Sequence, residues 1–196
     1  MKDFLHLTQT NANFELQQQR GSRGLYGTKV DGAEQFSEHE IQHISSRNSF
    51  YMATVNEDGW PYVQHRGGED GFVKILGPTR IGWVERTGNR QYLGTGNITA
   101  NGRVSMILVD YAQRTRLKLL GAATYYGDPD EALTAALNPH GHRIDGAITL
   151  EVVATTWNCP KYITPRIEVE HVSGVLDELQ QRVAELEAEN AQLVAG

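Results

Sequence analysis

Cationic and amide side chains recur beside glycines in three separate stretches of the chain. The stretches are His65-Arg66-Gly67-Gly68, Asn89-Arg90-Gln91-Tyr92-Leu93-Gly94-Thr95-Gly96-Asn97 and Arg116-Leu117-Lys118-Leu119-Leu120-Gly121. Arginine donates charge-assisted hydrogen bonds to phosphate oxygens, and backbone N–H groups at glycine-containing turns add further donors. Asn89, Gln91 and Asn97 offer amide donors and acceptors to a polar ligand. The pattern predicts a cradle for a phosphate-bearing ligand.

The third stretch alternates in polarity, with Arg116 and Lys118 two residues apart and Leu117 and Leu119 in the other positions. Successive residues of a β-strand leave opposite faces of the sheet, so we expect both cations on one face. Two adjacent cations repel each other unless water or an anion lies between them. For each single residue, the alternative is an exposed turn or sheet position that binds nothing.

Charge is unevenly distributed along the chain. The formal net charge is −6, whereas the stretch from Arg66 to Lys118 has nine Lys and Arg against four Asp and Glu. A basic middle within an acidic protein suits a compact anionic ligand better than a long polyanion, which the acidic remainder would repel. We therefore expect a small-molecule ligand and no nucleic-acid partner.

Length and composition indicate one globular domain with appendages. The chain has 196 residues, of which 39% are hydrophobic and 21% charged. No apolar run approaches the roughly 20 residues that cross a bilayer, and the start, Met1 to Phe4, shows no apolar signal segment. The single cysteine, Cys159, excludes an internal disulfide framework and a cysteine-rich metal site. We expect a cytoplasmic protein with no membrane association and no bound metal.

Turn signals and changes of period divide the chain into short elements. We expect an N-terminal arm over residues 1–36 with one short helix, then a helix from Ser37, whose Glu40 completes a capping box, to about Arg47. Three hairpins follow, formed by segments 49–56 with 60–65, 72–76 with 80–86, and 104–111 with 115–126. A helix over 129–137 with Asp128 as its N-cap and a strand over 147–157 come next. Strands joined by short turns predict an antiparallel barrel, since closure removes exposed edges.

The C-terminal tail carries an amphipathic repeat. Residues 172, 176, 179, 183, 186, 190 and 193 are apolar except Asn190, and they step alternately by four and three. Leucine at the d positions 179, 186 and 193 with Asn190 at an a position is typical of parallel coiled-coil dimers. The alternative is an amphipathic helix that packs on its own barrel, because isolated short helices are marginally stable.

Several of these stretches together resemble the pyridoxamine 5′-phosphate oxidase-like family of FMN-binding split barrels. The likeness covers roughly residues 48–126, with weaker likeness on both sides. Gly88-Asn89-Arg90-Gln91 is similar to the Gly-Ser-Arg-Lys segment with which those oxidases hold the FMN phosphate, and Lys74 lies 16 residues before Arg90. The segments 65–68, 71–74 and 157–166 resemble an uncharacterised flavin-nucleotide-binding subgroup of that family.

The resemblance implies a mainly β fold with peripheral helices. It implies an FMN-binding split barrel over residues 37–167 and a homodimer with the flavin at the subunit interface. The heptad repeat, which the resemblance does not cover, predicts a coiled-coil-like helix over 168–196. By the same match Lys74 and Arg90 would contact the phosphate, Gln91 would stand where the family has Lys, and Arg116 would stand where it has a flavin-binding Gln. The full set of expected FMN-binding residues is Arg66, Lys74, Asn89, Arg90, Gln91, Asn97, Arg116 and Lys118.

The chain departs from the oxidases at its C-terminal end. There the oxidases use a segment with Trp and Arg to complete the flavin and substrate site, whereas this chain continues into the heptad repeat, and Trp157 and Arg166 are only loosely comparable. We therefore expect an FMN-dependent oxidoreductase that acts on an unidentified small molecule, with no residue singled out as its acid or base. The alternatives are a non-catalytic flavin carrier or redox sensor, and a split barrel that binds haem.

Overall fold

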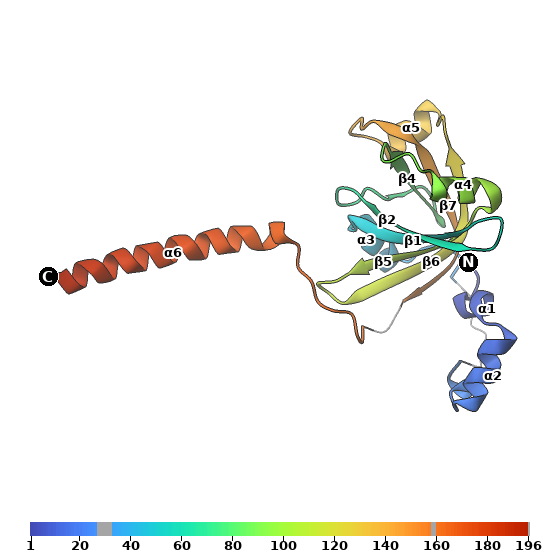
Figure 1. The fold of residues 1–196 in the computed structure, drawn as a ribbon, viewed down its shortest axis with the longest axis horizontal. Helices are drawn as coiled ribbons and strands as arrows, with labels where there is room; N and C mark the ends of the chain where they lie inside the picture. Colours follow the sequence, from blue (N-terminus) through green and yellow to red (C-terminus); the bar gives the residue numbers. More distant parts are fainter. Residues whose placement is uncertain (27–32, 158–159, 196) are drawn as a thin grey trace. The chain divides into compact units, whose positions relative to one another are not determined.

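Seven strands pair into one antiparallel sheet in the computed structural model, which describes residues 1–26, 33–157 and 160–195. The strands are β1 (Ser49–Val55), β2 (Pro61–Gly67), β3 (Lys74–Ile75), β4 (Arg80–Arg86), β5 (Arg103–Asp110), β6 (Thr115–Tyr126) and β7 (Ile144–Trp157). Their order in the sheet is β2-β1-β5-β6-β7-β4-β3 (Figure 1). The three expected hairpins and the following strand are all present, although β3 is only two residues long.

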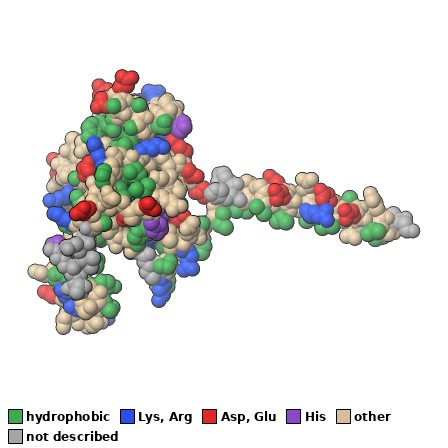
Figure 2. Space-filling model, turned by 180° about the vertical axis from the view of Figure 1, so that it is seen from behind, with side chains coloured by type: hydrophobic (Ala, Val, Ile, Leu, Met, Phe, Trp, Pro, Cys, Tyr) green, Lys and Arg blue, Asp and Glu red, His purple; other side chains and the backbone are tan. Residues whose placement is uncertain are grey.

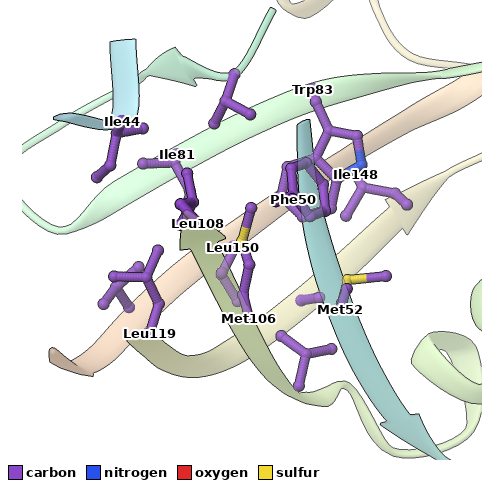
Figure 3. Packing of buried hydrophobic residues seen from close by; sticks show 14 of the residues in the cluster. Ile44, Phe50, Met52, Ile81, Trp83, Met106, Leu108, Leu119, Ile148 and Leu150 are labelled. Atoms are coloured by element: carbon purple, nitrogen blue, oxygen red, sulfur yellow. The ribbon is translucent and has the colours of Figure 1, made fainter. Parts of the chain in front are cut away.

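The sheet curls around a single main core. Residues of β1 alternate between buried and exposed positions, so that Phe50 and Met52 point inward. The ring of Phe50 lies 5.0 Å, centroid to centroid, from that of Trp83 on β4, although three strands separate β1 from β4 in the sheet order (Figure 3). Contact between distant strands of one sheet requires the sheet to close on itself. The fold is therefore the expected split β-barrel, with β2 and β3 at the two edges of the sheet.

A bulge at Gly121 helps the sheet to bend. The register between β6 and β7 shifts between Leu120 and Gly121. A Cβ atom at Gly121 would lie 2.4 Å from the carbonyl oxygen of Glu151, closer than real Cβ atoms come to backbone. Only glycine therefore permits the two strands to approach so closely at this point.

The helix α3 (Glu38–Ser45) begins as the sequence predicts. The Ser37 hydroxyl accepts a hydrogen bond from the Glu40 N–H at 3.2 Å, and the Glu40 carboxylate accepts one from the Ser37 N–H at 2.8 Å. This reciprocal arrangement is the capping box expected from the two residue types.

Two expectations for helices need correction. The helix α5 (Glu131–Leu137) is capped by Asp130 and not by Asp128, because the Asp130 carboxylate accepts the Leu133 N–H at 2.7 Å. The N-terminal arm holds α1 (Phe4–Thr8), α2 (Asn11–Gln19) and a 3₁₀ turn, η1 (Arg23–Tyr26), where one short helix was expected.

One further helix, α4 (Leu93–Asn101), lies between β4 and β5 and was not predicted. It contains Gly94 and Gly96, which weaken a helix by about 1 kcal/mol each relative to alanine, so the propensity of the segment gives little sign of a helix. It ends at Asn101 and is followed by Gly102, whose φ of 68° is the left-handed conformation common after helix C-termini.

The strands and α1 to α5 belong to one compact unit, Met1–Asp110 with Thr115–Pro160, and a second unit contains Tyr111–Arg114 with Lys161–Gly196. The second unit holds α6 (Val169–Ala195), a helix of 27 residues, and a contact of the Arg166 guanidinium with the Tyr111 ring at 4.9 Å. The expected C-terminal helix is therefore present. Within the described ranges, no helix combines the length and the apolarity needed to span a membrane.

Candidate functional site

A cavity of about 310 Å³ opens in the barrel unit between β2 and β4. These strands are not neighbours in the sheet, so no ladder of backbone hydrogen bonds joins them there. Its wall is formed by residues of β2, β4, the loop that follows β4, the first turn of α4, and Asp145 of β7. The cavity thus lies at the split of the barrel.

An ion pair between Arg66 of β2 and Glu85 of β4 spans the split. Both side chains are about nine-tenths buried, with 11% and 12% of their surface exposed. Arg66 also donates from Nη2 to Oε1 of Gln64 at 3.1 Å. Arg66 Nε, Glu85 Oε2 and the indole N–H of Trp83 are buried without a hydrogen-bond partner in the described part of the chain. Because buried polar groups are nearly always paired, this wall suits a polar ligand or ordered water.

The loop after β4 adopts an unusual backbone conformation at the cavity mouth. Arg90 and Tyr92 have φ values of 59° and 51°, a left-handed region that costs non-glycine residues about 1–3 kcal/mol each. The Asn89 carbonyl oxygen Oδ1 accepts the Gln91 N–H at 3.1 Å and so stabilises the turn. Such strain is common in loops that hold a side chain against a ligand.

Asp145 fastens this loop to β7. It accepts a hydrogen bond from the Thr87 hydroxyl at 2.7 Å and another from the Tyr92 hydroxyl at 3.1 Å. The Thr87 hydrogen bond, with smaller contributions from Tyr92 and the charge of Arg90, holds the pKa of Asp145 below its usual range. Desolvation, together with the Asp145 carboxylate, raises the pKa of Tyr92. At neutral pH the mouth therefore presents a carboxylate beside a protonated phenol.

The first turn of α4 supplies donors without a side-chain cap. Its N-cap, Tyr92, makes no side-chain capping hydrogen bond, and Leu93, Gly94 and Thr95 line the cavity. The first N–H groups of a helix lack intrahelical acceptors and lie at the positive end of the helix dipole. A Cβ atom at Gly94 would lie 2.9 Å from Oε1 of Gln64, so glycine keeps the backbone open to the cavity. This turn is suited to an anionic group.

The cations of the cavity differ in how they are paired. Arg66 pairs with Glu85, and Arg86 pairs with Glu69. Among the described residues, Arg90 has no hydrogen-bond or ion-pair partner, although its charge acts on Asp145. Arg90 is therefore the cation of this cavity that can pair with an incoming anion without breaking an existing ion pair.

Half of the residues that the sequence predicts to bind FMN lie at this cavity. Arg66, Asn89, Arg90 and Gln91 line it. Lys74, Asn97, Arg116 and Lys118 lie elsewhere in the barrel unit.

Lys74 and Asn97 have partners of their own. Lys74 Nζ donates to the Gly71 carbonyl oxygen at 2.8 Å. Asn97 Nδ2 donates to the Thr54 hydroxyl at 2.9 Å, which ties α4 to β1. Within this chain both side chains therefore make hydrogen bonds that stabilise the structure around the cavity.

Arg116 and Lys118 lie on the outer face of the sheet, as the alternation predicts. In the register, Lys118 lies opposite Ile107, Ile107 lies opposite Tyr51, and Tyr51 lies opposite His65, so these side chains share that face. Exposed apolar side chains on the same face include Tyr51 at 38%, Val55 at 36% and Val63 at 62%. We refer to this surface of β1, β2, β5 and β6 as the outer sheet face.

Sequence reasoning missed Gln64, Glu85, Tyr92 and Asp145. Glu85 had a signal, because a carboxylate that directly follows the apolar run from Ile81 to Val84 on the same strand must find a partner if it is buried. Asp145 had none, since its partners Thr87 and Tyr92 lie more than 50 residues away along the chain.

A family model described as pyridoxamine 5′-phosphate oxidase matches residues 37–174 of the chain. A candidate pyridoxamine 5′-phosphate oxidase from Lactobacillus delbrueckii has a similar structure, with a TM-score of 0.50 and 22% identity, over 63% of this chain and 95% of that one. HupZ from Group A Streptococcus has a similar structure too, with a TM-score of 0.51 and 14% identity, over 67% of this chain and 100% of that one. At these identities the solved structures establish a shared fold. Among curated proteins, none matches this sequence.

Proposed function

The chain belongs to the pyridoxamine 5′-phosphate oxidase family, and on that premise we propose that it binds FMN at the cavity between β2 and β4 and serves as an oxidoreductase for a small molecule. When bound, FMN supplies the redox chemistry, and the protein supplies binding, orientation and control of access. The residues present fit such a ligand. The wall contains unsatisfied polar atoms, and its cations outnumber its carboxylates.

The observation that carries this proposal is the convergence of Arg90 and the uncapped first turn of α4 on one cavity. Both favour a phosphate, one through a guanidinium without another partner and the other through backbone N–H groups. Asn89 and Gln91 add amide groups beside them. We therefore assign the phosphate of FMN to this end of the cavity.

The size of the cavity supports a site shared between two copies of the chain. Small-molecule pockets span about 300–1,000 Å³ and enclose most of their ligand, so a cavity of about 310 Å³ is at the lower limit. The outer sheet face carries Arg116 and Lys118 together with exposed apolar side chains. In our proposal two barrels pair through this face, and the second copy brings its two cations toward the flavin.

Titration of apoprotein with FMN tests the assignment. Replacing Arg90 by Ala should weaken FMN binding about 10- to 150-fold, because a charge-assisted hydrogen bond contributes about 1.5–3 kcal/mol. The matched control is Arg20→Ala, which removes the same charge from an exposed position at the end of α2, outside both the cavity and the sheet. Equal affinities of both variants would refute the phosphate assignment.

Two further measurements separate the proposed oxidoreductase from its alternatives. The absorption spectrum of purified protein distinguishes a flavin from a haem, which gives a Soret band. Turnover with a nicotinamide donor and an electron acceptor distinguishes an enzyme from a flavin carrier.

Sedimentation tests the proposed pairing of two barrels. The FMN-loaded protein at micromolar concentration should sediment as a dimer. Val63→Glu, at an exposed position of the outer sheet face, should shift it toward monomer.

A further inference from the structure

The helix α6 presents a row of apolar side chains to solvent. Leu176, Leu179, Val183, Leu186 and Leu193 are between 43% and 79% exposed. Figure 2 shows hydrophobic side chains along one side of this helix, with most acidic side chains on the other. A helix of 27 residues gains little stability while such a stripe is exposed to solvent, because helical stability in proteins comes mainly from packing of the apolar side. We therefore expect the stripe to pack against another protein surface.

The spacing of the stripe specifies what kind of partner fits. Positions 176, 179, 183, 186, 190 and 193 alternate steps of three and four, a period of 3.5 residues. This period keeps a narrow seam facing another helix of the same period, whereas a helix packed on a globular core shows a wider stripe with a period of 3.6. We propose that α6 from two copies of the chain pair as a parallel two-stranded coiled coil. This proposal does not depend on the identity of the cofactor.

Asn190 favours the parallel orientation. In a parallel, in-register pair, each Asn190 meets the Asn190 of the second copy, and two amides can satisfy each other's donors and acceptors. The antiparallel alignment that overlaps the seam best pairs Val183 with Leu186, Leu176 with Leu193, and Leu179 with Asn190. That alignment buries each amide against a leucine without a hydrogen-bond partner, which is costly. A single polar a position therefore discriminates between the two assemblies.

Charges beside the seam are compatible with the same arrangement. With Leu176, Val183 and Asn190 at a, Arg182 falls at g and Glu187 at the following e. In a parallel pair these two positions of different chains lie next to each other, so two symmetric Arg–Glu pairs form. Arg182 already pairs with Glu185 of its own helix at 2.9 Å, which holds its side chain in this region. Because the residues are exposed, these pairs contribute to register more than to affinity.

The seam is short, so pairing benefits from a second point of attachment. Tethering two helices through an additional dimer contact converts their association into an intramolecular event with a high effective concentration. The proposed contact between outer sheet faces would supply such a tether. The coiled coil then adds to the dimer without being its only source.

Disulfide trapping in the full-length chain tests the pairing and its direction. In a background with Cys159→Ser, we place a single cysteine by Leu179→Cys at a d position, and by Gln181→Cys at the f position as the control. In a parallel pair, position 179 of each chain lies within disulfide reach of its counterpart, whereas position 181 points away. We expect the Leu179→Cys chains to form a covalent dimer after mild oxidation, whereas the Gln181→Cys chains should stay uncrosslinked. Adding Leu186→Asp should abolish the crosslink at 179.

Two outcomes would overturn the proposal. In the antiparallel alignment the two positions 179 are 11 residues apart along the helix, about 16 Å, so Leu179→Cys would fail to crosslink with itself. A mixture of Leu179→Cys and Asn190→Cys chains would then form the mixed dimer. If neither the single variant nor the mixture crosslinks more than Gln181→Cys, the stripe packs on the chain's own barrel or on another partner.

Discussion

Removing the Glu85 carboxylate should destabilise the barrel strongly, because the change leaves the Arg66 guanidinium buried without its counter-ion. The two side chains are only 12% and 11% exposed. Breaking a buried ion pair by deleting one partner costs about 3–5 kcal/mol, and Gln64 satisfies only part of the remaining guanidinium. We therefore expect Glu85→Ala to lower the free energy of unfolding by about 3–5 kcal/mol, measured by urea denaturation of protein freed of ligand.

The matched control is the ion pair of Arg80 and Glu151, which joins paired positions on β4 and β7 and is exposed by 39% and 55%. Glu151→Ala should cost only about 0.2–1 kcal/mol. A double-mutant cycle with Arg66→Ala and Glu85→Ala isolates the interaction, and the double variant should cost less than the sum of the single variants. If Glu85→Ala costs no more than Glu151→Ala, the ion pair does not hold the two sides of the split together.

Three other changes have defined outcomes. Gly121→Ala should lower the thermal midpoint, at a cost of about 1–3 kcal/mol, because its Cβ would meet the Glu151 carbonyl at 2.4 Å; Gly96→Ala, with no atom within 4 Å, should not lower it. Asp145→Asn should be less stable than wild type at neutral pH, and the difference should vanish as pH falls through the depressed pKa of Asp145, below its usual 3.8, in acid denaturation curves. Burial lowers the pKa of His43 below 6.5, so stability should decrease as pH falls from about 6.5, and His43→Gln should flatten that part of the stability profile.

Much of the fold could be predicted because its signals are local. Alternating burial in β1 and the Ser37 capping box depend on residues within a few positions of one another. The helix α4 could not be predicted in this way, because Gly94 and Gly96 oppose a helix and their packing beside β1 and β2 overrides that preference. The cap of α5 was misplaced by two residues, since Asp128 and Asp130 both precede the helix and only geometry distinguishes them.

The candidate site also contains residues that local sequence signals identify and residues that they do not. Asn89, Arg90 and Gln91 could be identified because one short loop holds them together. The partnership of Arg66 with Glu85 could not, because it joins strands that meet only when the sheet closes. The pairing of Lys74 with the Gly71 carbonyl likewise depends on a side-chain conformation that the spacing of lysines and arginines does not specify.

The position of β7 has a consequence for the order in which the chain folds. This strand is the last of the sheet in sequence, yet it lies between β6 and β4 and is the strand that connects the hairpin of β3 and β4 to the remainder. During synthesis, which proceeds from the N-terminus, one wall of the cavity therefore has no sheet to join until residue 157 has emerged. Until then the backbone N–H and C=O groups of β4 and β6 that pair with β7 are open to other chains, and such long-range pairing is intrinsically slow. Chains that stop before β7 should accumulate as aggregates, whereas chains that stop after residue 168 retain every strand needed to fold.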